Sequence, residues 1–186
     1  MTLYLIPKPP DKLGRKNRES GWRHVPFDRQ ARKEIEDRVE PLRDKGITAV
    51  YSSDLDTKYA EIIRDHIDIP TVRPEFHLRR FNVGKLHTAD RSIVDEQLRN
   101  LSQKWAKNKD IPVRGGDSLT SFEKRFIKRY KQILAEQGTA AMIVDERTLS
   151  VIRDLSTNKY GPTSLVPNGS GPAMDRIYKV EPIARA

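Results

Sequence analysis

Short apolar runs alternate along the chain with longer segments whose apolar residues recur every three or four positions. The first run, Thr2 to Ile6, consists of β-forming residues and ends at Pro7, which is typical of a buried strand. Further strands are predicted over residues 47–51, 71–72, 140–144 and 177–180. This alternation predicts an α/β fold, a three-layer sandwich in which helices cover both faces of a mostly parallel central sheet.

The segments between these strands carry helix signals. Asp28 can cap a helix with Ile35 and Val39 on its apolar stripe, and Pro41 is expected to kink or shorten its end. A second helix is expected through about His66, and a third over residues 90–107. The apolar positions expected to face the core on these two helices are Tyr59, Ile62, Ile63, Ile93, Leu98, Leu101 and Trp105.

The clearest helix is predicted from Asp117 to about Gln137, followed by Gly138. Another helix opens over residues 148–155. The long helix has one apolar stripe, formed by Leu119, Phe122, Phe126, Tyr130 and Ile133. Its opposite face is basic and is either simply solvated or a nucleic-acid contact; it comprises Lys124, Arg125, Lys128, Arg129 and Lys131.

The length of 186 residues predicts one domain, and no repeat or linker divides it. Residues 9–27 are rich in Pro and Gly and predict a long loop. Residues 156–186 are expected to form a turn-rich C-terminal extension that ends in the short strand at 177–180, after the turns from Pro167 to Pro172. The extension and the loop from Lys8 to Pro26 are the surfaces most open to a partner.

Charge favours anionic partners. Lys and Arg number 35 against 26 Asp and Glu, a formal charge of +9, which suits nucleic acid, an acidic protein surface or a phosphorylated ligand, or is only a solvated basic surface. The chain has no cysteine, so disulfides and thiolate metal sites are excluded. No early apolar run is long enough for a signal peptide or a membrane span. A cytoplasmic location is expected, or alternatively a place in a virion.

Several motifs occur in an order and spacing that resemble the histidine phosphatase superfamily, the phosphoglycerate-mutase-like proteins, over about residues 1–155. The first strand is followed by a basic loop containing Gly21-Trp22, and Ser52-Ser53-Asp54-Leu55 ends the second strand. The segment from Leu78 to Gly84 is similar to the family's Leu-x-Glu-x-x-x-Gly, and Gly115-Gly116-Asp117-Ser118 to its Gly-Gly-Glu-Ser. The resemblance implies the same fold.

In this family a histidine attacks phosphorus, two arginines and a second histidine hold the phosphoryl oxygens, and an acid protonates the leaving group. At the nucleophile's position stands Lys8, whose ammonium has no lone pair, and Pro7 replaces the first arginine. The second arginine falls on Thr57, or near Lys58 if the alignment is gapped. Arg80 replaces the acid, and the second histidine falls on Asp145 or Glu146.

Every chemical position has therefore changed while the framework motifs persist. We predict a protein without phosphatase activity that has a structural or protein-interaction role, as a pseudoenzyme or as a component of a larger assembly such as a phage particle. The partner would be another protein or a second copy of the chain. Phosphatase or mutase activity through non-standard residues is a further alternative, although no nucleophile–base pair is visible at a suitable spacing.

A remaining alternative is an anion-binding module that keeps the pocket without its chemistry. Its candidate ligands are the basic residues Lys8, Lys12, Arg15, Arg80 and Arg147. The four histidines lie away from the catalytic positions, and no metal-ligand spacing or nucleotide-binding glycine motif is present. No metal site and no cofactor is therefore predicted.

Overall fold

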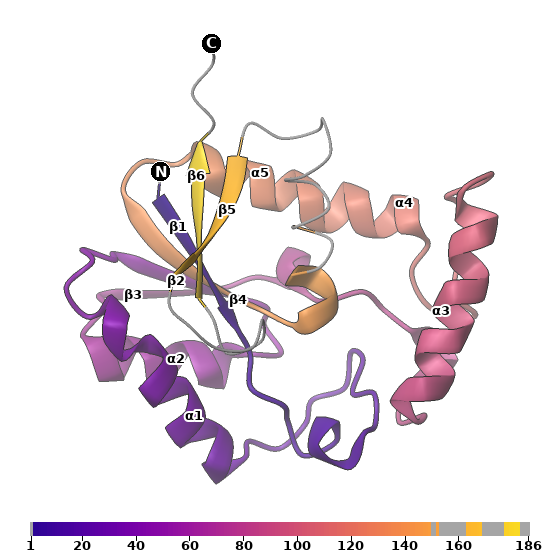
Figure 1. The fold of residues 1–186 in the computed structure, drawn as a ribbon, viewed down its shortest axis with the longest axis horizontal. Coiled ribbons are helices and arrows are strands. Elements are labelled where there is room, and N and C mark those ends of the chain that lie inside the picture. The colour runs from indigo at the N-terminus through magenta and orange to yellow at the C-terminus, as the bar shows by residue number, and fades with distance from the viewer. Residues whose placement is uncertain (1, 150–151, 153–162, 169–176, 183–186) are drawn as a thin grey trace.

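A six-stranded sheet forms the centre of the molecule (Figure 1). The computed structural model describes residues 2–149, 152, 163–168 and 177–182. The sheet order is β3-β2-β4-β1-β6-β5, in which β3, β2, β4 and β1 run parallel, β6 is antiparallel to β1, and β5 is antiparallel to β6. The strands are β1 Thr2–Pro7, β2 Ala49–Ser52, β3 Thr71–Pro74, β4 Thr139–Val144, β5 Thr163–Asn168 and β6 Ile177–Pro182.

Two helices cover one face of the sheet. The carboxylate of Asp28 accepts a hydrogen bond from the Gln30 amide and caps α1 Arg29–Val39. A 3-10 turn, η2 Glu40–Leu42, contains Pro41 and ends this helical region, as predicted from the proline. The second helix is α2 Thr57–Ile67. Both helices pack their apolar sides against alternate residues of β1, β2 and β4, which confirms their predicted core positions.

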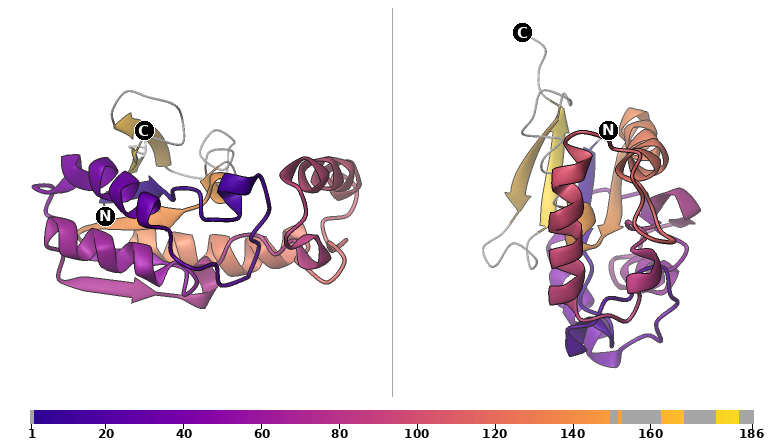
Figure 2. Two further views of the ribbon diagram at one scale, coloured as in Figure 1. Left: turned by 90° about the horizontal axis from the view of Figure 1, so that it is seen from below. Right: turned by 90° about the vertical axis from the view of Figure 1, so that its right-hand side faces the viewer.

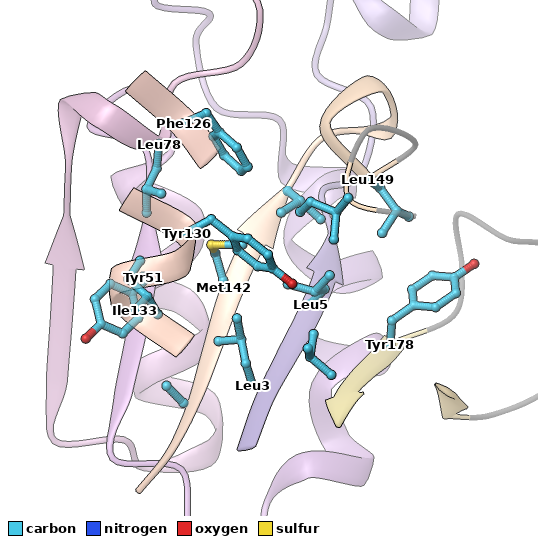
Figure 3. Close-up of a cluster of buried hydrophobic side chains, with 14 of the residues drawn as sticks. Leu3, Leu5, Tyr51, Leu78, Phe126, Tyr130, Ile133, Met142, Leu149 and Tyr178 are labelled. Carbon is cyan, nitrogen blue, oxygen red and sulfur yellow. The ribbon is translucent and has the colours of Figure 1, made fainter. Parts of the chain in front are cut away.

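The opposite face is covered by the long helical segment near the C-terminal half of the chain (Figure 3). It begins at α4 Leu119–Phe122, continues through a π-helical turn, η5 Glu123–Ile127, and ends in α5 Lys128–Ala135. Phe126 stacks on Phe122 at 5.3 Å and on Tyr130 at 6.3 Å between ring centroids. The predicted continuous helix is therefore shorter and is interrupted by the π turn. Together the two covered faces confirm the three-layer α/β architecture.

A further helix, α3 Arg91–Trp105, lies at one end of the molecule (Figures 1 and 2). The predicted apolar stripe is wrong at its first position, because Ile93 is 49% exposed whereas the neighbouring Val94 is fully buried. The Trp105 indole N–H donates to the Ile111 carbonyl at 2.7 Å, which turns the chain back after the helix. Three short 3-10 turns lie in the connections: η1 Gly14–Lys16, η3 Phe76–Leu78 and η4 Gly84–Leu86.

The remaining differences concern element boundaries. β2 begins at Ala49, two residues later than predicted, and β3 continues to Pro74. β5 occupies part of the region predicted as turns and forms an edge strand, where proline is tolerated because one side of the strand needs no N–H donor. The helix predicted over 148–155 begins at residue 146, and most of its remainder lies outside the described residues.

Candidate functional site

A pocket opens at the carboxyl ends of the two central strands. The backbone N–H of Lys8, directly after β1, donates to the carbonyl of Val144, the last residue of β4, at 2.7 Å. Residues that follow the two strands therefore lie side by side, which is where ligands bind in open α/β sheets. The pocket has about 190 Å³ of accessible volume, and the loop after β1 forms much of its wall.

Lys8 lies at the base of this pocket and is only 8% exposed. Its ammonium donates to Asp56 Oδ1 at 2.9 Å and lies 3.5 Å from Asp11 Oδ2. It also sits 5.4 Å from the centre of the Tyr59 ring. The side chain at the expected nucleophile's position is thus a buried cation, and two carboxylates hold it in place.

Asp56 is the main partner of this cation. Its second oxygen, Oδ2, accepts a hydrogen bond from the Ser53 hydroxyl at 2.6 Å. Burial alone would raise the pKa of Asp56, but the charges of Lys8 and Arg80 outweigh it and lower the pKa to about 2. Burial also acts to raise the pKa of Asp11, but the charge of Lys8 and the hydrogen bond from the Gly14 N–H outweigh it and lower the pKa. Both carboxylates are therefore ionised at neutral pH.

Arg80 stands at the position of the expected acid. One guanidinium nitrogen donates to the Ser20 hydroxyl at 2.7 Å, and another lies 3.9 Å from Asp56 Oδ1. Burial would lower the pKa of Arg80, but the charges of Asp56 and Asp145 hold it above its usual value. A group that remains protonated in this way has no proton to give to a leaving group.

Asp145, at the position expected for the second histidine, caps the start of the next helix. Its Oδ1 accepts hydrogen bonds from the backbone N–H groups of Arg147 and Thr148 at 3.0 and 3.1 Å, and its Oδ2 accepts one from the Thr148 hydroxyl. This is the arrangement of a helix N-cap. The carboxylate is therefore used by the helix that starts at residue 146. The adjacent Glu146 lines the pocket, with its carboxylate 3.5 Å from Arg91.

Two other expected positions contribute little to the pocket. Pro7 ends β1, and its carbonyl accepts a hydrogen bond from Arg38. Thr57 begins α2 and donates its hydroxyl to the Asp54 carbonyl at 3.0 Å, away from Lys8. The residue before it, Asp56, reaches Lys8 instead. Sequence reasoning missed Asp56; the signal was its place one residue before the expected arginine.

The five basic residues predicted as anion ligands do not all converge. Lys8 and Arg80 line the pocket. Arg15 instead pairs with Asp28 at 2.7 Å and with Glu34 at 2.9 Å. Arg147 pairs with the buried Glu19 and, at 2.6 Å, with Asp95. Lys12 is exposed on the loop, outside the pocket lining.

Acidic and basic groups balance in the pocket. Its basic lining residues are Lys8, Arg18, Arg38, Arg80 and Arg91, and its acidic lining residues are Asp11, Glu19, Glu34, Asp145 and Glu146. A phosphoryl group entering here would meet carboxylates as often as cations. Within the described part of the chain, no three carboxylate or imidazole groups come together as a metal site would require. No helix in that same part is both long and apolar enough to cross a bilayer.

The framework motifs pack against one another and against the segment that carries Arg80. Gly84 has a φ of +54°, and a Cβ there would lie 2.3 Å from the Arg114 carbonyl and 2.6 Å from Gly116 N, so the two glycine motifs pack backbone to backbone. Asp117 accepts from the Asn82 N–H and pairs with Arg125, both at 2.9 Å. These motif residues support the segment that carries Arg80.

Comparisons with known proteins agree with this geometry. A family model of the histidine phosphatase superfamily (branch 1) matches residues 13–157. Similar solved structures include a mycobacterial glucosyl-3-phosphoglycerate phosphatase, with 15% identity, a TM-score of 0.65 and coverage of 86% of this chain and 81% of that one. A protein described as mycobacterial hydrolase 1 has 14% identity, a TM-score of 0.66 and coverage of 97% and 96%.

The α-ribazole phosphatase from Shigella flexneri is also similar, with 20% identity, a TM-score of 0.63 and coverage of 84% of this chain and 80% of that one. At these identities the likeness concerns the fold. A search of curated protein sequences finds no significant match.

Proposed function

The chain belongs to the histidine phosphatase superfamily, and from that premise we propose that it is a member without phosphatase activity that has a structural or protein-interaction role. The observation that carries this proposal is the buried contact of Lys8 with Asp56 and Asp11 at the carboxyl end of β1. In an active relative a histidine nitrogen would attack phosphorus from this position. An ammonium that donates its protons to two carboxylates has no lone pair for such an attack.

The groups around Lys8 support the same conclusion. Transfer of a phosphoryl group requires fixed positive donors that are free to meet the charge that develops on its oxygens. The cations nearest to Lys8 are already opposed by carboxylates, and Arg80 remains a cation where an acid is needed. Restoring one residue, as in Lys8→His, is therefore not expected to restore activity, because Pro7 and Thr57 still stand where the two arginines belong.

An interaction role fits what has been retained. The glycine motifs and the Asp117–Arg125 pair maintain the shape of the domain without taking part in chemistry. A scaffold preserved in this way acts through its shape, as a subunit of a larger assembly or as a pseudoenzyme bound to a partner protein. The partner is another protein or a second copy of this chain.

We expect the purified chain to release no more p-nitrophenol from p-nitrophenyl phosphate than buffer alone. An active histidine phosphatase, measured in parallel, provides the positive control. Lys8→Met and Arg80→Gln, each shown to be folded by circular dichroism, should give the same background rate. Turnover by the wild type that either substitution abolishes would overturn the proposal, as would a phosphorylated protein trapped after acid quenching.

The interaction role has its own test. Size-exclusion chromatography with light scattering on the full chain should reveal a stable homo-oligomer, or a stoichiometric complex when the protein is isolated from its native source. A strictly monomeric protein at high concentration that co-purifies with nothing would contradict this part of the proposal while leaving the loss of activity intact.

A second candidate function is the binding of an anion in the pocket that Lys8 and Arg80 line. It is favoured by the presence of Lys8 and Arg80 in one pocket, where an external anion would compete with Asp56 Oδ1 for the same two cations. Calorimetry with inorganic phosphate tests it, with the double substitution Lys8→Met and Arg80→Gln as the comparison. If the wild type gives no salt-sensitive heat of binding, this candidate is eliminated.

A further inference from the structure

A basic groove is lined by residues of η3 and of the α4–α5 segment. That segment covers the sheet face opposite α1 and α2 (Figure 1). The groove is an open depression of about 630 Å³. The residues that matter for its chemistry are Phe76, His77, Lys124, Arg125, Lys128 and Arg129. Four of its lining residues are lysine or arginine, and none is aspartate or glutamate, in contrast to the balanced pocket beside Lys8.

The two lysines of this groove are available to a ligand. Arg125 is paired with Asp117, and Arg129 is paired with Glu75 at 2.5 Å. In the part of the chain that the structure describes, Lys124 and Lys128 have neither an ion pair nor a side-chain hydrogen bond, and both are exposed. They are four residues apart and therefore project from the same side of the helical segment. Lys124 lies within the π turn η5, a feature often found at functional sites.

An aromatic ring stands beside these cations. Phe76, in η3, is 46% exposed, although it is one of the large apolar residues that a fold normally buries. Its orientation is fixed by an edge contact with Trp22, at 5.4 Å between centroids, and by the Arg79 guanidinium 4.6 Å from its centre. A ring that is held rigidly but remains half open to solvent is suited to stacking with a planar group.

From this combination we infer that the basic groove binds single-stranded nucleic acid. Unpaired bases stack on exposed aromatic rings while lysines and arginines hold the phosphates, and this pairing of contacts recognises single strands without reading their sequence. A chain of acidic side chains alone, such as polyglutamate, would use the cations but has no ring to stack on Phe76, and a duplex would offer phosphates but no free base. The inference does not depend on the loss of phosphatase activity.

The test uses the full chain and a fluorescein-labelled oligothymidylate of about 20 nucleotides, followed by fluorescence anisotropy at several salt concentrations. Wild-type binding should weaken steeply as salt increases. The slope of log affinity against log salt should become less steep by about 1.4 when Lys124→Gln is combined with Lys128→Gln, since each phosphate contact on a single strand contributes about 0.7 to that slope. Phe76→Ala should weaken binding by about tenfold at each salt concentration without changing that slope.

The matched control is Lys33→Gln combined with Lys45→Gln, which removes the same charge from exposed positions on α1 and the turn before β2. It should leave affinity close to the wild-type value. The inference fails if no salt-dependent binding is seen, or if the control weakens binding as much as the groove variant does. It also fails if polyglutamate displaces the oligonucleotide efficiently and Phe76→Ala has no effect, because the groove would then be a site for an acidic protein.

Discussion

Replacing Phe126 by alanine is expected to destabilise the protein by about 3–5 kcal/mol, a large part of the free energy that holds a domain of this size folded. Phe126 is 1% exposed and lies between the rings of Phe122 and Tyr130, above the β4 and β1 side chains (Figure 3). The substitution leaves a cavity in the layer between sheet and helix, because backbone on both sides prevents its collapse. Urea denaturation followed by circular dichroism measures the loss.

The matched control for this prediction is Ile93→Ala on α3. Ile93 is an apolar residue on a helix, as Phe126 is, but it is half exposed, so its loss should change the free energy of unfolding by no more than about 0.5 kcal/mol. Phe126→Leu should lie between the two, since it restores volume but not ring stacking. Equal effects of Phe126→Ala and Ile93→Ala would contradict the assignment of this core.

The hydrophobic periodicity predicted the architecture because burial against a sheet face imposes that periodicity on strands and helices. β1 lies at the centre of the sheet and must be apolar on both faces, and α1 must start at a residue that satisfies its free N–H groups, which identifies Asp28. Periodicity placed α3 correctly but chose Ile93 over Val94, since adjacent apolar residues leave the buried one ambiguous by about a quarter turn. It could not reveal the π turn, which leaves the stripe of Phe122, Phe126 and Tyr130 continuous.

The site was less accessible to sequence reasoning. The motifs predicted Lys8 and Arg80 at two positions where the family carries catalytic residues, and the structure places both side chains in one pocket. What neutralises them could not be read from spacing, because Asp56 lies 48 residues from Lys8 and reaches it only through the packing of α2 against the sheet. The framework glycines were recognised by pattern alone; their contact, Gly84 against Gly116, appears only when the two loops meet.

Removing the charge of Lys8 is expected to have the second large effect. Lys8→Met keeps a long unbranched side chain but leaves the Asp56 carboxylate, among the residues that the structure describes, with Ser53 and the more distant Arg80 as partners. Breaking a buried ion pair from one side costs about 3–5 kcal/mol, and the remaining partners of Asp56 place this variant near about 3 kcal/mol at neutral pH. Urea denaturation of wild type and variant across a pH series measures it.

The effect of Lys8→Met should depend on pH in a definite direction. The pKa of Asp56 is about 2 in the folded protein against an ordinary value of 3.8, so its ionised form stabilises the fold above 3.8 and that contribution is lost as pH falls towards 2. Without Lys8, burial raises the pKa of Asp56 relative to the wild type. The deficit of the variant should therefore be largest above about pH 4 and shrink below it, as Asp56 takes up a proton in both proteins.

A lysine on the surface of the neighbouring helix provides the control for this last prediction. Lys58 pairs with Glu61 at 3.0 Å, but its side chain is 63% exposed, so Lys58→Met should change stability by no more than about 0.5 kcal/mol. A Lys8→Met deficit that does not shrink between about pH 7 and about pH 3 would mean that Lys8 acts through packing alone, because the ionic contribution of Asp56 must decline as the pH falls below 3.8 towards 2. A deficit that shrinks as the pH falls identifies the Lys8–Asp56 contact as an ion pair that stabilises the fold.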